Sequence, residues 1–166
     1  MEKSKLDELL ELEKELQVPS LSNEDALAIG LAAAAFVKKN KNHGVYIEVR
    51  RGENVIFSYC MEGANWDNRL FAERKLNTVV KFEHCSMLAE EKYKSKGRNF
   101  YDYYPPQEYQ SKGGGFPLSI PGTGMVGMIG VSGLSAAEDH EVCVEAIRAF
   151  LKQAERRSDD VSKGIR

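Results

Sequence analysis

The chain has 166 residues, of which 42% are hydrophobic and 29% are charged, with 23 basic residues against 25 acidic ones. This length fits one domain with a hydrophobic core and is short for two. A formal charge of −2 provides no general attraction for nucleic acid or for an anionic membrane, so neither is expected as a partner. The longest apolar stretch, Ala26 to Val37, is too short to span a bilayer.

The N-terminus and the cysteines indicate where the protein works. The chain begins as a polar, charged helix pattern and not as a signal peptide. Its three cysteines have no tight spacing, which favours a reducing compartment over a disulfide framework. We therefore expect a cytoplasmic protein.

Hydrophobic periodicity predicts two helices at the start of the chain. The segment 3–18 places leucines at helical spacing, and Pro19 ends it. Ser22 and Asp25 form a capping box that opens a second helix through Phe36. We treat residues 1–18 as an N-terminal helical extension of a single domain that covers residues 1–166.

The period then changes from helix to strand. Alternation predicts strands over 45–50 and 55–61, joined by a turn into a hairpin. Asn65 or Asp67 is expected to cap a third helix that runs to about Phe82, and Ser86 begins a short charged helix.

A tyrosine-rich loop, Asn99 to Gln110, follows the short helix. Aromatic side chains in such a loop suit either a flat ligand or a protein interface, and we favour the interface. The loop has no interleaved basic patch, which weakens the case for stacking on nucleic acid.

A second hairpin and a last helix complete the chain. Short β-branched runs predict strands over 116–120 and 125–131, and Ser135 with Glu138 forms a clean capping box. The charged tail 156–166 is expected to fray. This order predicts an α+β fold in which a central antiparallel sheet, built from two hairpins, is flanked by helices.

Glycine is unevenly distributed. Eight of the 14 glycines lie between Gly113 and Gly133. The run Gly113 to Gly115 precedes Phe116-Pro117 and a strand, so it fits neither a Walker loop nor a dinucleotide-binding fingerprint. Two interpretations remain: the glycines allow positive φ and a tight entry into the strand, or their backbone amides bind an anion.

The start of the last helix holds the candidate catalytic residues, Asp139 and His140. A helix N-terminus after Ser132-Gly133 is a potential anion site. Adjacent helical residues point about 100° apart, so their spacing alone does not make an acid–base pair. The alternative is that Asp139 stabilises the helix start and His140 is partly exposed.

Charged residues on the third helix offer a second group of candidates. Arg74 and Lys75 suit the carboxylates of a ligand or of a neighbouring subunit, although such charges are often solvated surface. The histidines and cysteines show no CxxC or HxxxH spacing, so no metal site is expected.

Several motifs, in order along the chain, resemble one family. They are Asp67-Asn68 with Phe71 and Arg74-Lys75, then Gly114–Leu118, Gly122–Gly127, Val131–Ser135 and Glu138–His140. The set resembles the heme-degrading-domain superfamily, which includes GlcG-like and HbpS-like proteins and the C-terminal domain of PduO-type proteins. This resemblance implies helices that flank a central antiparallel sheet in profilin-like layering, homo-oligomers, and heme as a possible cofactor.

Two departures weaken the expectation of heme. Relatives often have histidine directly before the Gly-Gly-x-Phe-Pro segment, where this chain has Lys112. Heme-binding relatives also use a histidine near the N-terminal helix, and the segment 24–42 contains none.

We therefore expect a homo-oligomeric protein that binds a small molecule at the glycine-rich hairpin and the start of the last helix. The expected ligand-binding residues are Asn68, Arg74, Lys75, Gly114, Gly115, Phe116, Ser132, Gly133, Asp139 and His140. Two alternatives stay open: an enzyme that degrades heme or acts on a small anion through His140, and a structural or chaperone-associated scaffold.

Overall fold

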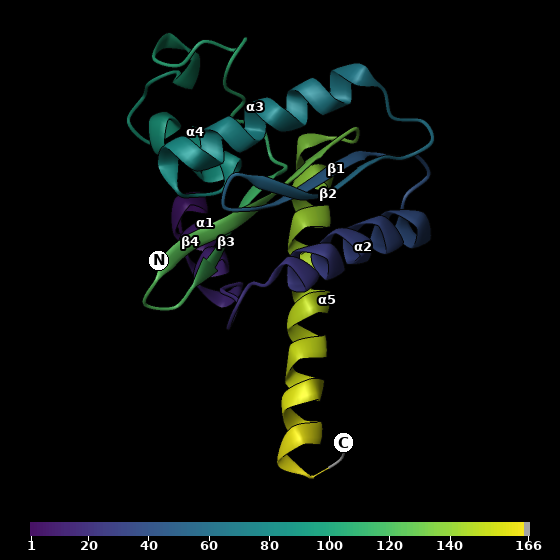
Figure 1. The fold of residues 1–166 in the computed structure, drawn as a ribbon. Helices are drawn as coiled ribbons and strands as arrows, with labels where there is room; N and C mark the ends of the chain where they lie inside the picture. The colour runs from purple at the N-terminus through teal and green to yellow at the C-terminus, as the bar shows by residue number, and fades with distance from the viewer. Residues whose placement is uncertain (165–166) are drawn as a thin grey trace.

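A four-stranded antiparallel sheet in the order β2-β1-β4-β3 lies at the centre of the computed structural model, which describes residues 1–164 (Figure 1). Its strands are β1 (Tyr46–Arg51), β2 (Asn54–Cys60), β3 (Gly115–Ile120) and β4 (Gly124–Ser132). The two hairpins join through β1 and β4, which pair antiparallel with Tyr46 opposite Ser132 and Arg51 opposite Gly127. This arrangement confirms the predicted sheet built from two hairpins.

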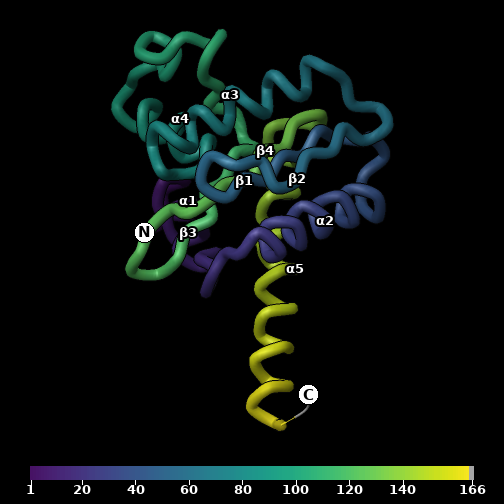
Figure 2. The backbone as a smooth tube through the Cα atoms, in the orientation of Figure 1, coloured from purple at the N-terminus to yellow at the C-terminus, as the bar shows by residue number. Residues whose placement is uncertain are grey.

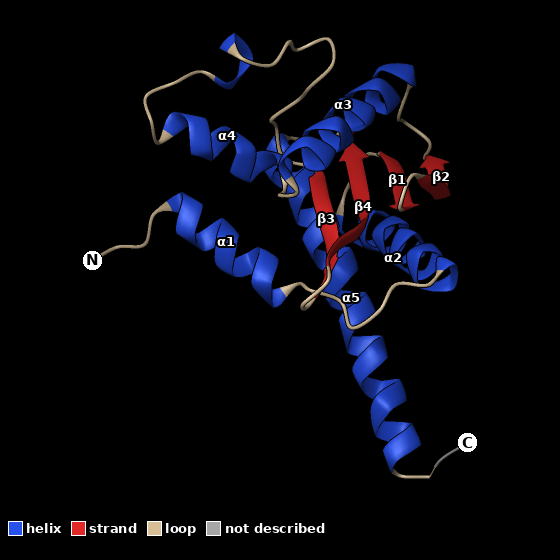
Figure 3. Cartoon of the chain, turned by 60° about the vertical axis from the view of Figure 1, so that its left-hand side comes forward, coloured by secondary structure: helices blue, strands red, loops and turns tan. Residues whose placement is uncertain are grey.

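Helices cover both faces of the sheet. The α2 (Asn23–Asn40) and α5 (Ala136–Ser162) helices pack on one face, and α3 (Trp66–Phe82) packs on the other. The α1 (Lys5–Glu15) and α4 (Ser86–Lys94) helices lie side by side beyond the β3 edge (Figure 3). The α+β fold with flanking helices is therefore confirmed.

The core forms because strand side chains alternate between the two faces. On the face toward α2 and α5, the buried strand residues include Ile47, Val49, Ile129 and Val131. On the opposite face, Met128 packs with Leu76 and Val79 of α3. The α3 helix comes close to β4 because Gly130 has no side chain: a Cβ there would lie 2.8 Å from Cγ of Leu76.

The N-terminal segment is packed into the domain. Leu16 is 1% exposed in the core, and the backbone N–H of Val18 donates to the carbonyl of Ser119 at 2.8 Å. The side chain of Glu13 accepts hydrogen bonds from the backbone of Cys85 and from Nδ1 of His84, both at 2.6 Å. These contacts fasten α1 to the start of α4.

The predicted helix starts agree with the structure. Ser22 and Ser135 make capping boxes, and Asn65 caps α3. The last helix continues to Ser162 and projects beyond the body of the domain (Figure 2), so residues 156–162 of the expected tail are helical and exposed. Their fraying stays a prediction, and residues 165–166 lie outside the described residues. Within residues 1–164, no helix combines the length and the apolarity that crossing a membrane requires.

Candidate functional site

A buried ion pair joins α3 to the start of α5. Nζ of Lys75 lies 2.9 Å from Oδ2 of Asp139 and donates to the carbonyl of Val131 at 3.0 Å. Lys75 is 4% exposed and Asp139 is 2% exposed. Oδ1 of Asp139 accepts from the backbone N–H of Leu134 at 3.0 Å. The pair therefore ties α3, the end of β4 and the first turn of α5 together, and Lys75 is bound within its own chain.

Glycine provides the space for this pair. Gly114 has φ of +124°, and a Cβ there would lie 2.3 Å from the carbonyl oxygen of Val131 and 2.8 Å from Nζ of Lys75. Only glycine adopts this conformation at low cost. The positive-φ interpretation of the glycine run is thus what the structure shows at Gly114.

The amides at the start of α5 are bound by the protein itself. The amide of Leu134 donates to Asp139, and Ser135 and Glu138 exchange hydrogen bonds in the capping box. An external anion would have to displace these carboxylate and hydroxyl oxygens.

Burial governs the protonation of the groups in and beside the ion pair. Burial raises the pKa of the Asp139 carboxyl, while the Lys75 ammonium and the amides of Leu134 and Gly133 oppose the shift. Burial raises the pKa of the Cys143 thiol, whose Sγ donates to the carbonyl of Gly114 at 3.4 Å. Cys143 is therefore an uncharged thiol and not a reactive thiolate.

The remaining expected site residues have other roles or positions. The structure gathers Lys75, Gly114, Gly115, Ser132, Gly133 and Asp139 around the ion pair. Asn68 instead accepts from the backbone N–H of Asn65 at 2.9 Å and closes the α3 capping box. The Arg74 guanidinium lies 5.4 Å from the ring centre of Phe71, and Phe116 is buried in the core at 1% exposure.

His140 points away from Asp139. Its ring lies 5.8 Å from that of Phe116, and among the described residues its buried Nδ1 has no hydrogen-bond partner. Burial lowers the pKa of His140 to about 4, so the imidazole is neutral near pH 7. The two carboxylate oxygens of Asp139 accept hydrogen bonds from Lys75 and Leu134. Asp139 and His140 are therefore not arranged as an acid–base pair.

A cavity that the sequence analysis missed lies between the N-terminal end of α3 and the β1–β2 hairpin. Its volume is about 470 Å³. We call it the hairpin cavity, and its lining residues are Tyr46, Glu48, Val55, Ser58, Cys60, Asn65, Trp66 and Arg69. The alternation of Tyr46, Glu48 and Arg50 along β1 was the available signal, since it places three polar side chains on one strand face.

The floor of the hairpin cavity is a buried carboxylate. Glu48 is 7% exposed; it accepts from the hydroxyl of Tyr46 at 2.7 Å and from Nε of Arg50. Burial and the neighbouring carboxylate raise the pKa of the Tyr46 phenol, which therefore stays a hydrogen-bond donor. At the mouth, the Arg69 guanidinium lies 4.9 Å from the ring centre of Trp66, which is 64% exposed.

Within the described part of the chain, no three or more histidine, cysteine, aspartate or glutamate side chains are grouped as a metal site requires.

Comparison with known proteins places the chain in a family. Residues 21–148 match the family described as haem degrading protein HbpS-like. A UPF0303 protein from Psychromonas ingrahamii is 33% identical over 157 residues, which cover 93% of this chain and 98% of that protein. The crystal structure of the Ybr137w protein superposes with a TM-score of 0.82 at 24% identity, over 91% of this chain and 90% of that one.

A further solved structure has the same fold. The crystal structure of a PduOC:heme complex superposes with a TM-score of 0.67 at 21% identity, over 78% of this chain and 94% of that one. The matched residues 21–148 run from the start of α2 into α5 and so include the whole sheet and the buried ion pair. The chain belongs to the haem-degrading HbpS-like family.

Proposed function

We propose that this protein is a homo-oligomeric, cytoplasmic small-molecule-binding protein whose ligand occupies the hairpin cavity. The observation that carries the proposal is the buried carboxylate of Glu48 on the cavity floor. Burying a carboxylate costs free energy unless it is paired and hydrogen-bonded, and Tyr46 and Arg50 hold this one in place. Such a prearranged polar group at the base of a cavity is typical of a ligand site.

The lining residues define the ligand chemistry. Glu48 supplies an acceptor, Arg69 supplies donors and Trp66 supplies a flat ring at the mouth. A volume of about 470 Å³ lies within the range of about 300–1,000 Å³ that small-molecule sites occupy. The cavity therefore suits a small polar molecule that has a flat portion and both donor and acceptor groups.

The glycine-rich segment has a positioning role in this proposal. The Lys75–Asp139 pair fixes α3 against β4, and α3 carries Trp66 and Arg69 to the cavity. Ser132 next to the pair lies opposite Tyr46 in the sheet register, so the two regions share one strand pair. Small-molecule binding is thus retained from the sequence analysis, and its location moves from the glycine-rich hairpin to the neighbouring cavity.

Exposed apolar side chains support a homo-oligomer. Val55, Trp66 and Phe71 are 52%, 64% and 39% exposed on β2 and α3, and Val55 and Trp66 line the cavity. A second copy of the chain is the occupant that the resemblance implies for such a surface. The three free cysteines, Cys60, Cys85 and Cys143, support the cytoplasmic location.

The residues around His140 do not fit heme. The cavity beside its ring is lined by charged α1 side chains, including Lys5, Glu8 and Glu15. A porphyrin needs apolar walls along both faces, and these side chains would lose hydration against it. We expect no Soret band on adding stoichiometric hemin, and a band that disappears in His140→Ala would contradict this.

Trp66 makes the proposal directly testable because it is the only tryptophan and lines the cavity. Native mass spectrometry of protein purified without added ligand reports any retained molecule, and a small-molecule library is then screened by Trp66 fluorescence. We expect Glu48→Gln and Arg69→Gln to lose the retained molecule or the fluorescence response. The matched control Arg157→Gln removes an exposed charge at the far end of α5 and should leave both unchanged.

Three outcomes would overturn the proposal. Equal retention by the wild type, Glu48→Gln and Arg69→Gln would place the ligand elsewhere. No retained molecule together with no Trp66 response from the library would reject small-molecule binding at this cavity. Light scattering that gives the mass of one chain would reject the homo-oligomer.

A further inference from the structure

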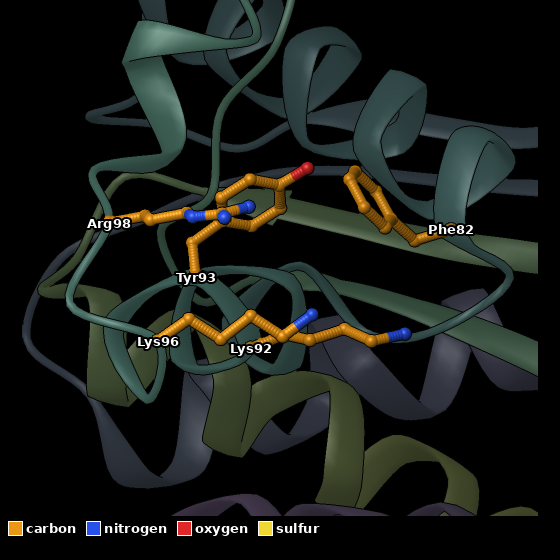
Figure 4. A pocket seen from close by; sticks show the side chains of 5 residues that line it. All are labelled: Phe82, Lys92, Tyr93, Lys96 and Arg98. Carbon is orange, nitrogen blue, oxygen red and sulfur yellow. The ribbon is translucent and has the colours of Figure 1, made fainter.

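A second cavity lies at the opposite end of α3. It is lined by Phe82 at the end of α3, Lys92 and Tyr93 of α4, and Lys96 and Arg98 in the segment that follows (Figure 4). Its volume is about 160 Å³. We call it the basic–aromatic cavity. Trp66 and Phe82 are separated by the length of α3, about 24 Å for a helix of this size, so the two cavities are separate sites.

The aromatic wall of this cavity is held in place by other rings. The rings of Phe82 and Tyr93 meet edge to face with centroids 6.3 Å apart, and Tyr93 contacts Phe100 at 5.6 Å. Phe100 is 2% exposed and stacks on Tyr104 at 4.9 Å. The tyrosine-rich loop is therefore packed on α3 and α4 of its own chain and gives the cavity a fixed wall.

Tyr93 is an uncharged part of that wall. Its hydroxyl donates to the hydroxyl of Tyr104 at 3.3 Å, and this hydrogen bond raises the pKa of Tyr93 to about 12. The ring can therefore lie beside an anion without repelling it.

The charges of the three cations are not neutralised by ion pairs within residues 1–164, and the Arg98 guanidinium lies 5.9 Å from the ring centre of Tyr103. Within residues 1–164, Lys92, Lys96 and Arg98 have no carboxylate within 4.0 Å, whereas Lys94 on the same helix lies 3.6 Å from Glu91.

The cations are not needed to cap α4 either. The carbonyl of Tyr93 accepts from the backbone N–H groups of Lys96 and Arg98, both at 3.0 Å, and Ser95 binds the carbonyl of Lys92. Figure 4 shows Arg98 beside the ring of Tyr93, with Lys92 and Lys96 extending below the two rings.

We propose that the basic–aromatic cavity binds a small organic anion composed of one unsaturated ring and a carboxylate or phosphate group. The ring packs against Phe82 and Tyr93, and the anionic group lies among Lys92, Lys96 and Arg98. The volume of about 160 Å³ is below the range of sites for drug-sized ligands, which limits the ligand to a single ring.

The test is an NMR titration of the full-length protein with benzoate and with phenyl phosphate, in which the amide chemical shifts report binding. We expect shifts at Tyr93 to Arg98, and binding that weakens as salt is raised. The double variant Lys96→Gln with Arg98→Gln should weaken binding about ten-fold, because each exposed ion pair contributes modestly. The matched control, Lys94→Gln with Lys152→Gln, removes two exposed charges outside the cavity and should keep the wild-type affinity.

Ring recognition is tested separately. Phe82→Leu, checked for folding by circular dichroism, should weaken phenyl phosphate more than inorganic phosphate. Equal affinities for phenyl phosphate and inorganic phosphate, or equal affinities of the two double variants, would overturn the proposal. The absence of shifts at 93–98 would also overturn it, whatever the outcome at the hairpin cavity.

Discussion

The side chain of Lys75 occupies the space that a side chain on Gly114 would need. A Cβ on Gly114 would lie 2.8 Å from Nζ of Lys75, and the ammonium is in turn 2.9 Å from Oδ2 of Asp139. A glycine on the entry to β3 therefore decides whether a lysine from α3 reaches an aspartate on α5. This relationship explains why a glycine-rich segment and a charged helix occur together in the sequence.

Gly114→Ala should destabilise the protein by about 2–4 kcal/mol, since it combines a strained φ with a contact that displaces the carbonyl of Val131 or the ammonium. Urea denaturation measures the loss. Gly122→Ala is the control: its φ is also positive, at +76°, but nothing lies within 4 Å of the added Cβ. It should cost about 1 kcal/mol. Equal losses in the two variants would show that the contact with Lys75 is unimportant.

Breaking the buried ion pair should cost more than removing it. Lys75→Met or Asp139→Leu alone leaves one buried charge without its partner, at a cost of about 3–5 kcal/mol. The double variant leaves no charge, so its loss should be smaller than the sum of the two single losses. A double-mutant cycle in urea measures this coupling, and additive losses would contradict it.

His140 should make stability depend on pH. Burial lowers its pKa from 6.5 to about 4. Between these two pH values the imidazole is protonated in the unfolded chain and neutral in the folded one. The contribution of His140 is fully present above pH 6.5 and is lost as the pH falls toward 4, by about 2–3 kcal/mol.

The free energy of unfolding, measured from pH 7.5 to 4, should fall less steeply in His140→Asn than in the wild type. The comparison between variants is needed because the raised pKa of Asp139 acts in the opposite direction. Identical slopes in His140→Asn and the wild type would contradict the assignment.

Glu13 should control the docking of α1. It binds both the backbone of Cys85 and the ring of His84, and its side chain is 12% exposed. Glu13→Ala should destabilise the protein by about 1–3 kcal/mol and speed amide exchange within α1. Glu11→Ala, which removes an exposed pair with Lys3, should do neither. Unchanged exchange in Glu13→Ala would show that the leucines alone hold the helix.

Local features of the fold were predictable because they depend on neighbouring residues. The capping boxes at Ser22 and Ser135 and the strand alternation from Tyr46 are patterns of nearby side chains, and the structure has each one. The end of α5 was harder to predict from the sequence, because the charged residues after Ala154 give no hydrophobic reason for the helix to continue.

The candidate site was also predictable only in its local features. The sequence by itself determined that glycines concentrate between Gly113 and Gly133, and it singled out Lys75 as a candidate binding residue. Only the tertiary structure decided that Lys75 binds Asp139, 64 residues away, and that His140 faces α1 instead.

The two cavities could not be predicted from the sequence, for a physical reason. Each forms where segments distant in the chain meet: Glu48 with Arg69 in one, and Phe82 with Arg98 in the other. Periodicity and capping report which face of an element is buried, and they contain no information about which two elements leave a space between them. The sequence thus determined the elements and the family, and the packing of α3 on the sheet and on α4 decided where a ligand has room.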